Sequence, residues 1–190
     1  RLLTLDDLDG DGEQEVGVSG WGAATVLLSA SGVFEFKADD TGERLGYDFA
    51  GADLDGDGVL DIAVGAPEKG AAVGTVYLFE GPVTAGGLAN ATSAHGIAGT
   101  GTYSRLGHRV AVGDMDGDGT DEVIASANGD DEGGYYAGAA FIIHDPAVSS
   151  VTEASDRFVG AGESWQCCRL TVGDFDGDGA DDLALGTPEA

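Results

Sequence analysis

One short acidic motif occurs four times along the chain and constrains the fold more than any other feature. In the copy DLDGDGVLD, Asp53 to Asp61, carboxylates stand at positions 1, 3, 5 and 9 and glycines at positions 4 and 6. Copies with the same carboxylate spacing begin at Asp7, Asp114 and Asp174. Because like charges at this density repel one another, each copy needs either full exposure to solvent or a cation among its carboxylates.

The sequence around the motif repeats as well, with the first aspartates 46, 61 and 60 residues apart. An apolar stretch precedes each motif and another follows it directly, as in IAVGAP and VIASAN. A third stretch (GTVYLFEG, AAFIIHDP) and a weaker fourth one (VFEFKA, AHGIAG, DRFVG) come next. Short runs of β-branched and aromatic residues between Gly, Asp and Asn turns predict strands. Each unit is therefore predicted to contain four short antiparallel strands, with the acidic loop joining the first strand to the second.

Four-stranded units that repeat every ~40–60 residues are typical of β-propeller blades. The alternatives are a sandwich of hairpins and a β-solenoid, whose rungs are usually shorter, ~20–30 residues. We expect an all-β chain with about three to four blades of an incomplete ring. The expected units of this single propeller segment are 1–43, 44–104, 105–164 and 165–190.

The charge of the chain excludes some partners. Its formal net charge is −27, from 35 acidic and 8 basic residues, whereas binding to nucleic acid or to an anionic membrane needs a basic surface. An apolar content of 42% argues against a disordered acidic tail. No apolar run approaches the ~20 residues of a membrane span. The sequence also shows no signal peptide and opens inside the repeat pattern, so a processed or trimmed start is expected.

Calcium explains the acidic motif best. It is a hard cation that takes 6–8 oxygen ligands, including carboxylates, backbone carbonyls and water. Carboxylates at positions 1, 3 and 5 converge if the chain curls, and the glycine at position 6 permits the turn. Position 7 varies in side chain, which suits a main-chain oxygen ligand, and position 9 closes the site. The expected ligands of about four sites are Asp7, Asp9, Asp11, Glu13 and Glu15; Asp53, Asp55, Asp57, Val59 and Asp61; Asp114, Asp116, Asp118, Thr120 and Glu122; and Asp174, Asp176, Asp178, Ala180 and Asp182.

Other interpretations of the motif fit less well. An EF-hand needs an acidic residue at position 12 between two helices, but here position 12 is apolar: Val18, Val64, Ala125 or Leu185. Magnesium prefers strict octahedral geometry and retained waters. Zinc and iron favour His or Cys, which the loops lack. The remaining alternative is four solvated acidic turns without metal.

With these repeated motifs the sequence resembles the FG-GAP repeat family, which forms the blades of integrin α-subunit propellers and occurs in many bacterial surface proteins. In the second unit, Leu45-Gly46-Tyr47 stands where the family has Phe-Gly, and Gly65-Ala66-Pro67 matches its Gly-Ala-Pro signature. The third unit has Leu106-Gly107 but Ser126-Ala127-Asn128, and the fourth has Gln166-Cys167 and then Gly186-Thr187-Pro188. The resemblance implies a β-propeller, calcium at the blade rim and an extracellular setting. It does not by itself imply integrin function, since one fold serves many functions.

We therefore expect a non-enzymatic, calcium-binding extracellular or cell-surface protein that serves adhesion, surface structure or assembly through protein or glycan contacts. One alternative is a lectin-like carbohydrate-binding propeller, and another is the binding portion of a secreted hydrolase or lyase. His95, His108 and His144 lie in different sequence contexts, with no serine or cysteine neighbour that suggests a nucleophile pair. Four aromatic residues are candidates for stacking on sugars or for a protein contact: Trp21, Trp165, Tyr135 and Tyr136.

Three further expectations concern modification and assembly. Asn90-Ala91-Thr92 is an N-glycosylation sequon in a predicted loop between third and fourth strands. Cys167 and Cys168 can form a vicinal disulfide, stay free, or pair with another chain, and we expect the disulfide. Because both ends of the sequence fall inside the repeat pattern, we expect either a segment of a longer propeller of about seven blades, as the resemblance implies, or a subunit completed by neighbours in an oligomer or fibre.

Overall fold

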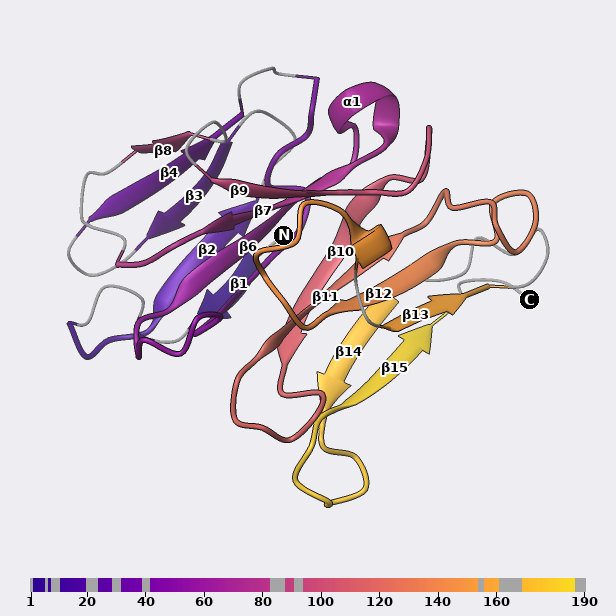
Figure 1. Cartoon of the computed structure of the whole chain (residues 1–190). Helices are drawn as coiled ribbons and strands as arrows, with labels where there is room; N and C mark the ends of the chain where they lie inside the picture. Colours follow the sequence, from indigo (N-terminus) through magenta and orange to yellow (C-terminus); the bar gives the residue numbers. More distant parts are fainter. Residues whose placement is uncertain are drawn as a thin grey trace.

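The strands form separate sheets that follow one another along the sequence, as Figure 1 shows. The structure is a computed structural model. It describes residues 2–5, 7, 11–19, 24–28, 32–38, 42–82, 88–90, 94–153, 156–160 and 169–186. The first, second and third sheets each contain four antiparallel strands, and the fourth contains two. These strands are consecutive in the sequence, except that one short strand of the first sheet comes before the last strand of the second. This arrangement confirms the predicted all-β fold with propeller-type blades.

The first sheet has the order β1-β2-β3-β4-β8. Its antiparallel strands are β1 (Leu2–Leu5), β2 (Glu15–Ser19), β3 (Ala24–Leu28) and β4 (Val33–Lys37). The fifth strand, β8 (Leu88–Asn90), comes from the second unit and pairs parallel with β4, with Asn90 opposite Lys37. The four antiparallel strands agree with the prediction for each unit, whereas the Asn90 sequon was predicted to lie in a loop. The loop prediction was wrong, because the segment after the third strand of the second unit extends the sheet of its neighbour.

The second sheet contains β5 (Phe49–Ala52), β6 (Asp61–Ala66), β7 (Thr75–Phe79) and β9 (His95–Ala98). The third contains β10 (Leu106–Gly113), β11 (Glu122–Ala127), β12 (Ala139–Ile143) and β13 (Asp156–Val159). The fourth contains β14 (Arg169–Gly173) and β15 (Asp182–Gly186). Two short turns of helix, α1 (Lys69–Ala72) and η2 (Val151–Glu153), lie in connecting segments.

The hydrophobic core lies between neighbouring sheets, and β6 shows why. All six residues of β6 are buried, and successive side chains of a strand point to opposite faces of its sheet. Ile62, Val64 and Ala66 belong to a cluster with Phe34 and Phe36 of the first sheet. Ala63 belongs to a second cluster that includes Phe141 of the third sheet. Because it is buried on both faces, the strand is apolar at every position after Asp61 instead of alternating.

The second and third sheets meet backbone to backbone at a pair of glycines. A Cβ added at Gly65 would lie 2.9 Å from the carbonyl carbon of Gly107 and closer still to its oxygen. Gly107 also has a φ of 85°, which favours glycine. Beside this pair, the Tyr47 hydroxyl and His108 Nε2 lie 3.2 Å apart. Burial, followed by the charges of Arg109 and Arg105, lowers the His108 pKa to about 4.

In the described part of the chain the sheets do not close into a ring. The second sheet lies between the first and the third, as Figure 1 shows, and β10 also contacts β14 of the fourth sheet. None of the helices among the described residues has the length and apolar character needed to cross a membrane.

Candidate metal centre

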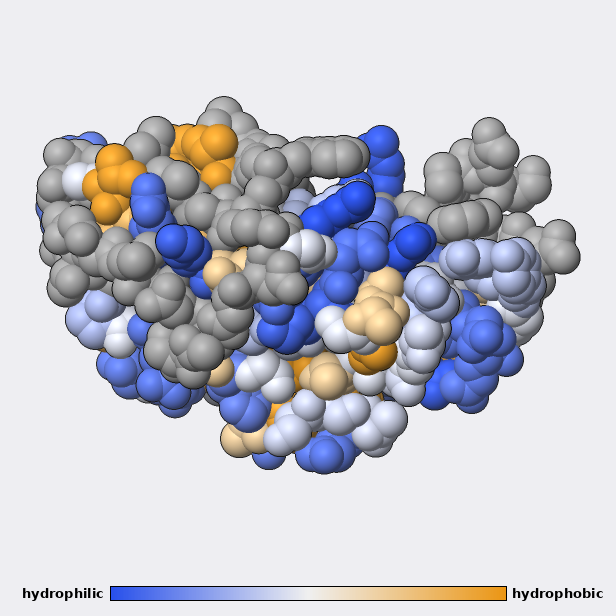
Figure 2. Space-filling model, turned by 90° about the horizontal axis from the view of Figure 1, so that it is seen from above, coloured by the Kyte–Doolittle hydropathy of each residue, from blue (hydrophilic) through white to orange (hydrophobic). Residues whose placement is uncertain are grey.

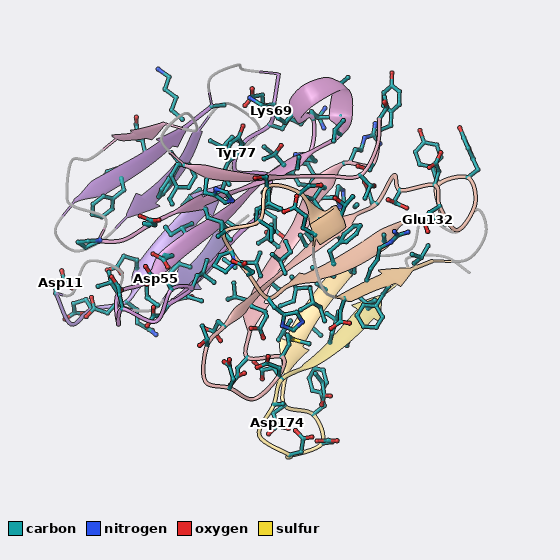
Figure 3. All side chains as sticks on the ribbon, viewed as in Figure 1. Asp11, Asp55, Lys69, Tyr77, Glu132 and Asp174 are labelled. Atoms are coloured by element: carbon teal, nitrogen blue, oxygen red, sulfur yellow. The ribbon has the colours of Figure 1, made fainter. Side chains whose placement is uncertain are left out.

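Each acidic motif forms the loop between the first and second strands of its sheet, as the sequence predicted. The loops join β1 to β2, β5 to β6, β10 to β11, and β14 to β15. In Figure 3, Asp11, Asp55 and Asp174 lie on loops along the lower side of the molecule, whereas Lys69 lies on the upper side. The position 12 residues Val18, Val64, Ala125 and Leu185 lie within the second strands, which agrees with the exclusion of an EF-hand.

Backbone hydrogen bonds to the position 1 carboxylate curl the loop. In the second loop, Gly56 N and Asp57 N donate to Asp53 Oδ1 at 2.8 and 3.1 Å, and Gly58 N donates to Asp53 Oδ2 at 2.8 Å. The φ angles of Gly56 and Gly58 are 76° and 85°, which explains glycine at positions 4 and 6. The third and fourth loops repeat these bonds at Asp114 and Asp174.

In the second, third and fourth loops, the position 9 carboxylate closes the loop onto its own start. Asp61, the first residue of β6, accepts a hydrogen bond from Leu54 N at 3.0 Å and another from Gly81 N at 2.8 Å. Glu122 and Asp182 accept equivalent bonds from the backbone N–H at position 2 of their loops, at 2.8 and 3.0 Å. An acidic residue at position 9 therefore fixes the loop as well as offering ligand oxygens.

The carboxylates of every loop come together. One ligand oxygen from each of three acidic residues lies within 4.8 Å of the others in each loop. The groups are Asp7, Asp11 and Glu15; Asp53, Asp55 and Asp57; Asp114, Asp116 and Asp118; and Asp174, Asp176 and Asp182. These donors are all hard oxygens, which fits a calcium ion and its 6–8 oxygen ligands.

Burial of some loop carboxylates raises their pKa, because desolvation disfavours the charged form. For Asp61, burial raises the pKa against the lowering effect of bonds from Gly81 N and Leu54 N. Burial also raises the pKa of Glu122, and that of Asp121, where Asp181 of the next loop adds to the effect. A dication among these carboxylates would stabilise their charged form and oppose the shift.

His144 is a neighbour of the third loop that the motif does not reveal. It follows β12 directly, and its Nδ1 lies 3.7 Å from Glu122 Oε1 and 3.8 Å from Asp116 Oδ2. His144 stands 22 positions after Glu122 in the sequence, and only the strand register brings the two together. Alignment of the predicted second and third strands was the one signal that could have found it.

The other candidate residues lie apart from one another. His95 Nε2 lies 2.6 Å from the Val148 carbonyl oxygen, and His108 contacts Tyr47. Tyr135 packs against Tyr136 with ring centroids 4.5 Å apart. Some expectations fall outside the described residues or side chains: those for Asp9, Trp21, Trp165, Cys167, Cys168 and the Asn90 side chain.

Comparison with known proteins points to one family. The profile of the FG-GAP repeat matches residues 45–79, 106–143 and 169–190, together about half of the chain. Integrin alpha-PS2 of Drosophila melanogaster is 29% identical over 153 residues, covering 76% of this chain and 10% of that protein. Human integrin alpha-IIb is 32% identical over 142 residues, covering 66% of this chain and 14% of that protein. Integrin alpha-4 of Xenopus laevis is 30% identical over 166 residues, covering 81% of this chain and 15% of that protein. The chain thus spans only a small part of the curated relatives that it matches.

Proposed function

The chain belongs to the FG-GAP repeat family, and on that premise we propose that it is a calcium-binding, extracellular or cell-surface repeat protein without enzymatic activity. In this proposal it acts in adhesion, surface structure or assembly through contacts with a protein or glycan ligand. The units proposed from the sequence, 1–43, 44–104, 105–164 and 165–190, are its blades and partial blade. An extracellular setting is supported by its similarity to integrin alpha subunits.

The convergence of carboxylates in all four loops carries the calcium part of the proposal. Each loop brings three acidic side chains within reach of one ion, on a backbone already curled by hydrogen bonds to position 1 in the second, third and fourth loops. Positions 1, 3, 5 and 9 would supply carboxylate oxygens, and the carbonyl at position 7 would complete each set. The bound ion would offset repulsion among carboxylates at the base of each blade.

The proposed ligand surface lies at the end of the blades opposite the acidic loops. There, the segments 99–105 and 128–138 join strands of the second and third sheets. They hold each other in place, with Gly129 N donating to the Ser104 carbonyl at 3.0 Å and Thr100 Oγ1 to Asp130 Oδ2 at 2.7 Å. Tyr103 and Tyr135 on these segments are 57% and 70% exposed. Seen from above, the described part of this side of the molecule is mainly hydrophilic, as Figure 2 shows. Exposed tyrosines on a polar, fixed surface suit contacts with protein or sugar.

The position of the histidines favours a binding role over the hydrolase or lyase alternative. His95 contacts a backbone carbonyl, His108 lies in the seam between two sheets, and His144 stands beside an acidic loop. A hydrolytic site needs a nucleophile or acid–base pair in one cleft. The described histidines do not share a cleft with one another, so no residue is assigned a catalytic role.

The experiment that tests the binding function is a screen of the immobilised protein against extracellular matrix proteins and a glycan array, in calcium and in EDTA. We expect calcium-dependent retention of at least one protein ligand and a loss of about tenfold in affinity for Tyr135→Ala or Tyr103→Ala, because exposed aromatic contacts often dominate binding energy. Phe175→Ala is the matched control, since Phe175 is 61% exposed but lies in an acidic loop at the other end. Binding confined to the glycan array would favour the lectin-like alternative. Equal loss from Phe175→Ala would contradict the proposed surface.

A further inference from the structure

The third acidic loop differs from the others in having a histidine beside it. β11 and β12 pair antiparallel with Val123 opposite Ile143, so the next residues, Glu122 and His144, also meet at the loop end of the sheet. In the second sheet, Ile62 lies opposite Phe79, so the equivalent neighbour of Asp61 is Glu80. The second sheet thus places a carboxylate beside its acidic loop, whereas the third sheet, which has the same strand arrangement, places an imidazole there.

The imidazole of His144 is oriented by a third carboxylate, in addition to those of Asp116 and Glu122. Its Nε2 lies 3.2 Å from Oδ2 of Asp156, the first residue of β13. Because a carboxylate only accepts hydrogen bonds, this contact assigns the proton of a neutral His144 to Nε2. The lone pair of Nδ1 then faces Asp116 and Glu122.

The distances around Nδ1 are too long for hydrogen bonds. Nδ1 lies 3.8 Å from Asp116 Oδ2 and 3.7 Å from Glu122 Oε1, whereas N–H···O bonds are about 2.7–3.2 Å long. The two distances from Nδ1 are close to the separation of two ligand atoms on a shared ion. Tetrahedral zinc with Zn–N and Zn–O bonds of about 2.0–2.2 Å places its ligand atoms roughly 3.3–3.6 Å apart. The three ligand atoms already lie within 4.8 Å of one another.

The surroundings of the three ligands suit an ion bound at the surface of the sheet. The side chain of Glu122 is only 4% exposed, and Met115 N fixes its other oxygen at 2.8 Å. Asp116 is 49% exposed and uses Oδ1 to accept from Asp118 N at 3.1 Å, so it turns Oδ2 toward His144. Asp116 thus presents one carboxylate oxygen to the acidic loop and the other to His144. Because the side chains of His144 and Asp116 are 24% and 49% exposed, water can reach the site as a further ligand.

We propose that His144, Asp116 and Glu122 form a mixed nitrogen–oxygen site for Zn²⁺, with Asp156 as the carboxylate that orients the histidine. Imidazole nitrogen favours zinc over calcium, which takes oxygen ligands. A carboxylate that accepts from the other ring nitrogen is the usual partner of a zinc-binding histidine. The absence of His and Cys from the loop sequences, which argued against zinc there, does not apply to a ligand supplied by a neighbouring strand. This site goes beyond the proposed calcium binding: it shares Asp116 and Glu122 with the third acidic loop, but its third ligand is an imidazole nitrogen.

The test is a zinc titration of the protein labelled with ¹⁵N-histidine, at saturating calcium and again in calcium-free buffer. The chain has three histidines, so their side-chain nitrogens can be assigned individually. Zinc is expected to shift Nδ1 of His144 and to leave His95 and His108 unchanged. Saturable zinc binding that shifts other histidines, or that leaves His144 Nδ1 unchanged, would overturn the proposal.

Matched variants distinguish the effect of the histidine on zinc affinity from the effect of the loop on calcium affinity. In His144→Gln we expect zinc affinity to fall at least tenfold while calcium affinity changes less than twofold. Asp156→Asn should weaken zinc binding by about 10–100-fold, the usual effect of removing an orienting partner. His95→Gln is the control, because His95 Nε2 lies 2.6 Å from the Val148 carbonyl oxygen and is no part of the proposed zinc site, and this variant should bind zinc as the wild type does. Zinc affinity that is unchanged in both His144→Gln and Asp156→Asn would contradict the site, and the wild-type spectra decide the question if either variant fails to fold. Zinc binding at His144 without calcium binding to the loops would leave this inference standing and contradict the proposed function.

Discussion

Removal of calcium is expected to lower the free energy of unfolding by about 5–6 kcal/mol. Extracellular calcium modules bind with Kd of about 10⁻⁴–10⁻³ M. At calcium ten times Kd, one site that exists only in the folded state contributes roughly 1.4 kcal/mol, so about four sites together give that total. Since whole domains have net stabilities of ~5–15 kcal/mol, chelation should lower the melting temperature steeply. Thermal unfolding in EDTA and in increasing calcium measures the effect.

Single-loop variants assign the effect to the loops. Asp55→Ala removes one carboxylate of the second loop and should abolish about 1.4 kcal/mol of the calcium-dependent stability. Asp131→Ala is the matched control, because Asp131 is exposed and lies in the segment 128–138, away from the acidic loops. Its calcium-dependent stability should equal that of the wild type. A melting temperature that responds neither to EDTA nor to calcium would show that the loops are solvated acidic turns.

Gly65→Ala is expected to destabilise the protein by about 3 kcal/mol or more, at the upper end of the cost of overpacking. The added Cβ would overlap the Gly107 carbonyl, a backbone group that cannot rotate away as a side chain can. Gly65 is also fixed in place, since its N–H donates to the Asp48 carbonyl at 2.8 Å and its own carbonyl accepts from Tyr47 N at 3.2 Å. The second and third sheets would therefore have to separate. Urea unfolding at fixed calcium measures the change.

Gly101→Ala is the control for this prediction. An added Cβ at Gly101 meets no atom within 4 Å, and Gly101 has no positive φ that would strain alanine. We expect its stability to lie within about 0.5 kcal/mol of the wild type. Equal stabilities of Gly65→Ala and Gly101→Ala would mean that the two sheets do not meet at this glycine pair.

The repeated loops and strands could be predicted because their patterns are local. Carboxylates at positions 1, 3, 5 and 9, with glycine at 4 and 6, follow from the curl of one short segment. β6 and β11 follow these loops directly as short apolar runs, and each was expected from its composition. The signature glycine Gly65 was also recognised, but its physical role emerges only from its contact with Gly107, 42 positions later in the sequence.

The features that were missed depend on contacts between distant segments. β8 pairs parallel with β4 across more than fifty residues, and its short sequence, Leu-Ala-Asn, has no strong strand pattern. His144 reaches the third loop through the register of β11 and β12. Asp48 lies close to the second loop in sequence, but it is fully buried, and its Oδ2 accepts from Val110 N of the next sheet at 3.2 Å. A single sequence does not reveal such pairings, because each depends on how neighbouring sheets pack.

The central claim, that a calcium ion lies among the carboxylates of each acidic loop, is tested most directly by anomalous diffraction from crystals grown in calcium. We predict one anomalous peak within each loop, about 2.3–2.6 Å from the carboxylate oxygens at positions 1, 3, 5 and 9 and from the carbonyl oxygen at position 7. For the second loop these ligands are Asp53, Asp55, Asp57, the Val59 carbonyl and Asp61. Ordered loops without any peak at saturating calcium, or with only water between the carboxylates, would contradict the account.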